Sequence, residues 1–140
     1  MSKIEWDESL SVGVSLIDEQ HKMLIQKLSD LSSAFRMGLE QNKIIKTLDF
    51  MIDYTDFHFS AEEKVMEEND YPGLREQKQQ HEEFRTTLNN IVEDYKEEGT
   101  TTAIAESINV FLHNWLVKHI KGSDAKLGQF LTEKGFESPD

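Results

Sequence analysis

The sequence contains no cysteine and only two prolines in its 140 residues. Without cysteine, the chain cannot form a disulfide framework or a zinc site built on thiolates. It also has no apolar run that approaches the roughly 18–20 residues that a membrane-spanning helix needs. The N-terminal residues lack the basic and then apolar order of a secretory signal. We therefore expect a cytoplasmic protein without a membrane partner.

Positive charge is scarce as well, since 15 basic residues stand against 27 acidic ones and the formal net charge is −12. A surface of this charge repels phosphate backbones, so we expect no nucleic-acid partner. Hydrophobic residues make up 37% of the chain and charged residues 30%, which is an ordinary mixture for a globular protein. The length predicts one domain over residues 1–140.

Glycine is sparse, and four of the seven glycines fall between strongly helical segments. These four are Gly38, Gly73, Gly99 and Gly122. Because a glycine commonly follows the last turn of a helix, they divide the chain into four helices with an arm before them and a tail after them. The predicted ranges are 1–17 for the arm, about 18–37, 42–68, 74–97 and 102–120 for the helices, and 124–140 for the tail.

Each of the four segments carries an apolar stripe with steps of three or four residues, which is the period of a helix and not of a strand. The first stripe is typical and consists of Ile17, His21, Leu24, Leu28, Leu31 and Phe35. Four amphipathic helices with short connections predict an all-α fold. The expected architecture is an antiparallel up-and-down four-helix bundle with an N-terminal arm and a short C-terminal helix.

Histidines and carboxylates occupy stripe positions where a bundle would have leucine. His21 and His81 lie near the starts of the first and third helices, whereas His58 and His119 lie near the ends of the second and fourth. These four helix ends meet at one level of an antiparallel bundle. One carboxylate follows His58 by four residues on the same helix face, and another follows the fourth helix and can fold back. The predicted cluster is therefore His21, His58, Glu62, His81, His119 and Asp124.

A cluster of this kind predicts bound metal, because isolated charges are costly to bury. Imidazole and carboxylate ligands without thiolate suit iron, zinc or manganese. Six ligands are more than one structural zinc takes, and two carboxylates can bridge two ions. Two ferrous ions would bring four positive charges, of which Glu62, Asp124 and a bridging hydroxide would offset three. The sequence therefore indicates a centre of two ions.

Several motifs give the chain a likeness to a known family over nearly its whole length. The motifs are Ile4-Glu5-Trp6-Asp7, Val14-Ser15-Leu16-Ile17-Asp18-Glu19-Gln20-His21, His58-Phe59-Ser60-Ala61-Glu62, Tyr71-Pro72, His81-Glu82-Glu83-Phe84 and Trp115-Leu116-Val117-Lys118-His119-Ile120-Lys121-Gly122-Ser123-Asp124. With these motifs the chain resembles the hemerythrin family, and in particular its single-domain bacteriohemerythrins. The spacing from His119 to Asp124 after a Trp-Leu pair is a specific signature.

The resemblance implies a non-haem centre of two iron ions, Fe2+ or Fe3+, with an oxo or hydroxo bridge, that binds O2 for storage, delivery or sensing. Carried over by position, Glu62 and Asp124 would bridge the irons. The histidines would divide into His21 with His58 at the iron with the open O2 position, and His81 with His119 at the other iron. Apolar neighbours would form a dry O2 pocket, with the candidates Leu24, Ile25, Met51, Phe84, Trp115 and Leu116.

One position departs from the family pattern. The family has a histidine four residues before the position of His81, where this chain has Gln77. The iron there would lose one of three imidazoles, and Gln77 would supply its amide oxygen as a weak ligand or hold a water in the vacancy. A third option is that Glu63 or Glu76 swings inward. Because a carboxamide donates less charge than an imidazole, metal affinity at this iron should fall.

Three functions compete for this sequence. The first is O2 binding, and the second is a di-iron oxidoreductase that acts on peroxide, NO or O2, which an open coordination position at Gln77 would favour. The third is an iron-storage or iron-sensing module with the same ligands. We expect a binding protein rather than an enzyme. Its ligand would be O2 or another small molecule such as azide, NO or peroxide, and the chain would be a monomer, with an oligomer left open.

Overall fold

The computed structural model describes residues 5–38, 41–98 and 102–136. Within these ranges the chain forms four long helices and a short C-terminal one, and it contains no strand. The helices are α1 (Ser15–Arg36), α2 (Gln41–Glu68), α3 (Leu74–Glu98), α4 (Thr102–His119) and α5 (Ala125–Glu133). The predicted all-α bundle with a short C-terminal helix is therefore confirmed. Residues 1–4 of the predicted arm and 137–140 of the predicted tail lie outside the described ranges.

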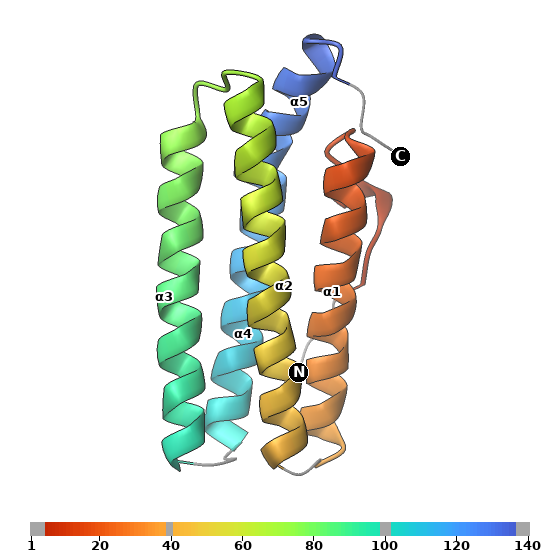
Figure 1. Cartoon of the computed structure of the whole chain (residues 1–140). Helices are drawn as coiled ribbons and strands as arrows, with labels where there is room; N and C mark the ends of the chain where they lie inside the picture. Colours follow the sequence, from red (N-terminus) through yellow and green to blue (C-terminus); the bar gives the residue numbers. More distant parts are fainter. Residues whose placement is uncertain (1–4, 39–40, 99–101, 137–140) are drawn as a thin grey trace.

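The four long helices pack side by side and alternate in direction (Figure 1). α2 lies between α1 and α3, and α4 contacts both α1 and α3 to close the bundle. The starts of α1 and α3 and the ends of α2 and α4 consequently lie at the same end, as the antiparallel arrangement predicts (Figure 1). None of the helices in the described ranges is long and apolar enough to cross a membrane.

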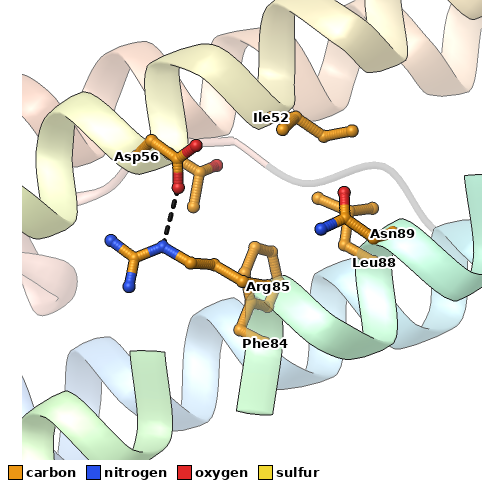
Figure 2. A pocket seen from close by; sticks show the side chains of 7 residues that line it. Ile52, Asp56, Phe84, Arg85, Leu88 and Asn89 are labelled. Carbon is orange, nitrogen blue, oxygen red and sulfur yellow. Dashed lines mark hydrogen bonds and ion pairs between the residues drawn. The ribbon is translucent and has the colours of Figure 1, made fainter. Parts of the chain in front are cut away.

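The half of the bundle away from the starts of α1 and α3 holds a mostly apolar core. Its completely buried side chains include Leu28, Leu31, Ile44, Leu48, Leu88 and Ile108. Burying a side chain of this size stabilises the fold by about 1.5–3 kcal/mol, so this half anchors the helices against one another. Between α2 and α3, Arg85 reaches across to Asp56 and forms an ion pair of 2.7 Å, which Figure 2 shows.

The glycines behave differently from one another. Gly38 follows α1 with a φ of +63°, a conformation that ends a helix, and Gly73 precedes α3. Gly122 was predicted to end the fourth helix, and this is wrong. It lies in a π-helical segment, Ile120–Asp124, through which α4 continues into α5, and it does not have the positive φ of a helix-ending glycine. Gly99 lies outside the described residues.

The π-helical segment decides where Asp124 points. In an α-helix, two residues five apart are separated by about 140° around the axis, so they face different sides. A π-turn instead bonds residues that are five apart, which places them one turn apart on the same side. His119 and Asp124 can therefore both face the interior, and both are buried. The fold-back that the sequence predicted is achieved by widening the helix and not by ending it.

The N-terminal arm packs on the outside of the bundle. It contains a 3-10 turn, Glu8–Leu10, and its apolar side chains Leu10, Val12 and Val14 are buried. Val12 crosses α5 at Gly128, where a Cβ atom would lie 2.0 Å from the Val12 carbonyl oxygen. This close approach requires glycine at position 128.

We expect Gly128→Ala to destabilise the fold by about 1–3 kcal/mol, because the added methyl group must push the arm away from α5. Urea denaturation of the metal-free protein measures the change. Gly122→Ala is the matched control, since a Cβ atom there meets no atom within 4 Å. Equal stability of the Gly128 variant and the parent protein would contradict the tight packing of the arm.

Candidate metal centre

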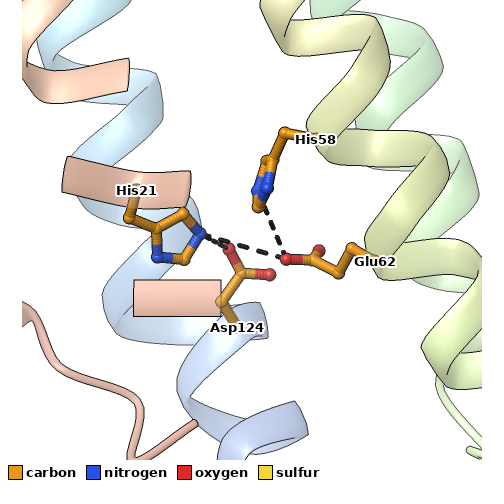
Figure 3. Close-up of side chains that lie close together, drawn as sticks. All are labelled: His21, His58, Glu62 and Asp124. Carbon is orange, nitrogen blue, oxygen red and sulfur yellow. Dashed lines mark ion pairs between the residues drawn. The ribbon is translucent and has the colours of Figure 1, made fainter. Parts of the chain in front are cut away.

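The six residues predicted as metal ligands are all buried and lie together inside the bundle. Their ligand atoms form two groups, and within each group all atoms lie within 4.8 Å of one another. The first group is His21, His58, Glu62 and Asp124, and the second is Glu62, His81 and His119. Figure 3 shows the first group, with Asp124 between His21 and Glu62. Because Glu62 belongs to both groups, two ions bound here would share it.

The two oxygens of Glu62 face different imidazoles. Oε2 lies 3.4 Å from Nε2 of His58 and 3.9 Å from Nε2 of His21. Oε1 lies 3.2 Å from Nε2 of His81 and 3.8 Å from Nε2 of His119. The carboxylate therefore stands between two pairs of imidazoles and presents one oxygen to each pair.

Asp124 spans the same two pairs. Its Oδ2 lies 2.9 Å from Nε2 of His21, and its Oδ1 lies 3.1 Å from Nε2 of His119. Each carboxylate thus presents one oxygen to either pair of imidazoles. Four imidazoles and two carboxylates form a nitrogen and oxygen donor set that suits iron.

Most donor atoms of the cluster have no hydrogen-bond partner, although they approach one another. The buried atoms without one include both ring nitrogens of His21, both oxygens of Glu62, Nε2 of His81, Nε2 of His119 and Oδ2 of Asp124. Each unsatisfied buried polar atom costs about 1–3 kcal/mol, so concentrating them at one point favours a partner that accepts electron pairs. The residues present therefore fit a centre of two metal ions.

Hydrogen bonds to side chains outside the ligand cluster orient three of the imidazoles. In each case Nδ1 of the ring contacts a side-chain oxygen on the preceding helix of the bundle. The pairs are His58 with Gln20 at 2.7 Å, His81 with Glu63 at 2.7 Å and His119 with Gln80 at 2.8 Å. Because amide and carboxylate oxygens only accept, Nδ1 carries a proton, and Nε2 is the nitrogen that would bind an ion.

The acceptor role of Gln20, Glu63 and Gln80 was missed by the reasoning from sequence, which considered Glu63 only as a replacement ligand. Each of them stands directly beside a predicted ligand in the sequence, and this adjacency is the signal that could have found them. A residue next to an inward-facing one points about 100° away around the helix, toward the boundary with a neighbouring helix. From there its side chain reaches the ligand of that neighbour.

Burial and mutual interaction shift the pKa values of these groups in the metal-free protein. Burial, reinforced by His21, lowers the pKa of His58 well below its ordinary value. Burial also opposes charge on His119, but Asp124 and Glu62 outweigh it and raise the pKa of His119 to about 9. Burial and the Asp124 carboxylate raise the pKa of Glu62. In Asp124, the imidazoles of His119 and His21 outweigh burial and hold the pKa well below its ordinary value.

Comparison with known proteins shows which family the chain belongs to. A family model described as the hemerythrin HHE cation binding domain matches residues 12–131. The chain is 30% identical to a bacteriohemerythrin of Stenotrophomonas maltophilia, across 95% of this chain and 90% of the relative. It is 31% identical to a myohemerythrin of Theromyzon tessulatum, across 87% of this chain and 88% of the relative. The chain belongs to the hemerythrin family.

Solved structures agree on the fold. The crystal structure of a hemerythrin variant with a leucine-to-alanine substitution matches with a TM-score of 0.84 and 24% identity, over 94% of this chain and 99% of that chain. Hemerythrins are non-haem di-iron proteins that bind O2, and the clustered histidines and carboxylates of this chain agree with that function.

Gln77, where the family resemblance implies a histidine, faces the cluster and is buried. Its Nε2 donates to Oδ1 of Asp124 over 3.1 Å, while its Oε1 is buried without a hydrogen-bond partner. The amide nitrogen thus contacts one of the two carboxylates that span the hemerythrin centre. Glu63 and Glu76 do not replace the missing imidazole, because Glu63 accepts from His81 and Glu76 is exposed.

A small apolar cavity of about 10 Å³ lies beside the hemerythrin centre. Five of the six predicted pocket residues line it, namely Leu24, Met51, Phe84, Trp115 and Leu116. The sixth, Ile25, is buried elsewhere in the core. The cavity is also lined by Thr55, Phe59 and Leu112, which the sequence analysis did not name as pocket residues. Its volume is close to what one water-sized molecule needs, and an apolar cavity stays dry.

The cavity lies one helical turn from the ligands. Each of the four long helices lines it with a residue three positions from its histidine. These residues are Leu24, Thr55, Phe84 and Leu116. Residues three apart are neighbours on one helix face, so the face that carries the ligands also forms the cavity wall.

Proposed function

We propose that the chain binds O2 reversibly at two irons held between the two pairs of imidazoles. The observation that carries this proposal is the position of Glu62 and Asp124, each of which presents one oxygen to either pair. The irons would be held by His21 with His58 and by His81 with His119, and both carboxylates would bridge them. When bound, the irons would supply electrons by changing between Fe2+ and Fe3+, and they would be joined by an oxo or hydroxo bridge. They would also supply an open coordination position for O2.

The side chains around the irons would supply charge balance, orientation and dryness. Glu62 and Asp124 offset part of the positive charge of two ions. The acceptors Gln20, Glu63 and Gln80 hold the imidazoles in the tautomer that directs Nε2 inward. The apolar cavity offers O2 a site from which water is excluded.

The visible spectrum of the ferrous protein on exposure to air tests the proposal. Reversible binding predicts a charge-transfer band that persists in air and disappears when O2 is removed. A second candidate function, redox turnover of peroxide, NO or O2, is favoured by the buried amide at Gln77, because an iron there would have only two imidazoles. Immediate and permanent conversion to a ferric spectrum would support turnover and contradict reversible binding.

Gln77→His is expected to slow autoxidation and to lengthen the life of the oxygenated protein, because an imidazole would fill the coordination position that the amide leaves open. Autoxidation rates by stopped-flow spectroscopy measure the effect, and azide affinity reports the remaining open positions. Gln79→His adds the same side chain at an exposed position of the same helix and serves as control. Unchanged autoxidation and azide binding in the Gln77 variant would show that Gln77 does not control the centre.

The remaining expectations extend the same proposal. Residues 1–140 would form one domain, and the chain would act as a cytoplasmic monomer. Azide and NO would compete with O2 for the open position. Light scattering at working concentration measures the mass in solution, and a mass of two chains or more would contradict the monomer.

A further inference from the structure

Two cavities of different character share a wall in this bundle. The inner one is the apolar cavity of about 10 Å³ beside the metal centre, and the outer one, of about 60 Å³, lies between α2 and α3. Thr55 and Phe84 line both cavities. A molecule in the outer cavity is therefore separated from the inner cavity by these two side chains.

The outer cavity leads from solvent toward the core. Its lining includes the exposed residues Asp56 and Asn89 on one side and the buried residues Thr55 and Leu88 on the other. Figure 2 shows the side chain of Arg85 extending from α3 toward Asp56 on α2 across this space. The ion pair, at 2.7 Å, has side chains that are 25% and 52% exposed, so it lies at the mouth of the cavity.

Thr55 is the weakest part of the shared wall. It is small, whereas the other residues around the inner cavity are leucine, methionine, phenylalanine and tryptophan. Its Oγ1 is buried without a hydrogen-bond partner, so no hydrogen bond to that atom holds the side chain in place. Phe84, in contrast, is fixed by ring contacts with Phe59 at 5.7 Å and Trp115 at 4.3 Å.

We propose that the outer cavity is the path by which O2 reaches the centre, with Thr55 as the partition and the Asp56–Arg85 pair as the outer closure. The proposal rests on the proposed O2-binding function. O2 is small and apolar, so it can pass an apolar partition during brief fluctuations of packing, whereas a hydrated ion must first lose its water and passes more slowly. Thr55 would then set the rates at which O2 enters and leaves.

Another surface cavity, of about 420 Å³, is lined by Trp115, which also lines the inner cavity, and by His119. This side is less suited to O2 passage for two reasons. Trp115 stacks on His119 with ring centroids 4.4 Å apart, so displacing it would disturb a ligand. The outer surface there carries the charged side chains of Glu83, Lys118 and Lys126.

Association and dissociation rates of O2 in the iron-loaded protein test the partition. Arg85 lines only the outer cavity, so Arg85→Ala should change both rates by the same factor and leave the equilibrium constant unchanged. Thr55 also lines the proposed O2 pocket, so its variants should change both rates in the same direction. We expect Thr55→Leu to slow both rates about tenfold, and Thr55→Ser and Arg85→Ala to accelerate both. Lys78→Ala is the matched control, because it breaks another α2–α3 ion pair, to Glu67 at 3.0 Å, that lies outside the outer cavity lining. Rates that do not change in parallel, or an equal effect of Lys78→Ala, would overturn the proposal.

A second measurement does not depend on iron. In metal-free protein carrying Trp6→Phe, Trp115 is the only tryptophan, and it lines the inner cavity. Quenching of its fluorescence by dissolved O2 should weaken in Thr55→Leu and strengthen in Thr55→Ser. Quenching that ignores position 55 but responds to Lys118→Phe or Lys126→Phe would overturn the α2–α3 path in favour of the Trp115 side. A parent protein that fails to bind O2 reversibly would contradict the proposed function while leaving this readout intact.

Discussion

Glu62→Gln is expected to lower the iron content from two ions per chain to fewer than one. Glu62 is the only residue common to both ligand groups among the described residues, and each of its oxygens faces its own pair of imidazoles. Glutamine has nearly the same shape, but it replaces one oxygen by an amide that donates. One of the two ions would then face the amide N–H groups of the glutamine instead of an oxygen lone pair. The negative charge of the ligand cluster would also fall by one unit.

Elemental analysis after desalting measures the iron content, and circular dichroism shows whether the variant is folded. Glu63→Gln provides the matched comparison, because it makes the same chemical change at the next residue. Glu63 accepts from His81 and belongs to neither ligand group, so that variant should keep two irons with about 10–100-fold weaker affinity at one of them. Two tightly held irons in Glu62→Gln would contradict the bridging role of Glu62.

Removing the irons is expected to lower the melting temperature by about 10 °C or more. Each ion that binds only the folded chain stabilises it by about 2.7 kcal/mol when its free concentration is 100 times its dissociation constant. One kcal/mol changes the melting temperature of a chain of this size by about 2–4 °C. Stripping the ions also leaves the donor atoms of His21, Glu62 and His81 buried without hydrogen-bond partners. The Asp124–His119 ion pair recovers only part of this loss.

Thermal melts of iron-loaded and chelator-treated samples, followed by circular dichroism, measure this difference. Glu62→Gln is the control, since a variant that holds less than one iron should melt at nearly the same temperature in both states. Equal midpoints for the loaded and stripped parent protein would contradict a stabilising centre.

The ligand cluster could be predicted because two simple rules determine it. Helical periodicity places His21, His58, His81 and His119 on inward faces, and alternating helix direction brings those positions to one level. The position of Asp124 could be anticipated only in outline. A spacing of five residues does not fit one face of an α-helix, and the π-helical segment that solves the problem has no clear sequence signal besides Gly122.

Other parts of the site depend on how the helices are rotated against one another, which the sequence pattern leaves open. The contacts of Gln20, Glu63 and Gln80 with imidazoles on other helices are of this kind. Gln77 was expected near the irons, but its hydrogen bond to Asp124 follows only from the packed geometry. The same holds for Thr55, which lies three residues before His58 but gains its place between two cavities from the packing of α2 on α3.

The most direct test of the account measures iron and releasable O2 in the same sample. Ferrous protein prepared without oxygen is exposed to air and then flushed with argon, while the visible charge-transfer band and dissolved O2 are followed over several cycles. The account predicts two irons per chain, and uptake and release of one O2 per chain together with the appearance and loss of the band. One iron or fewer per chain, or O2 that is consumed and never released, would contradict it.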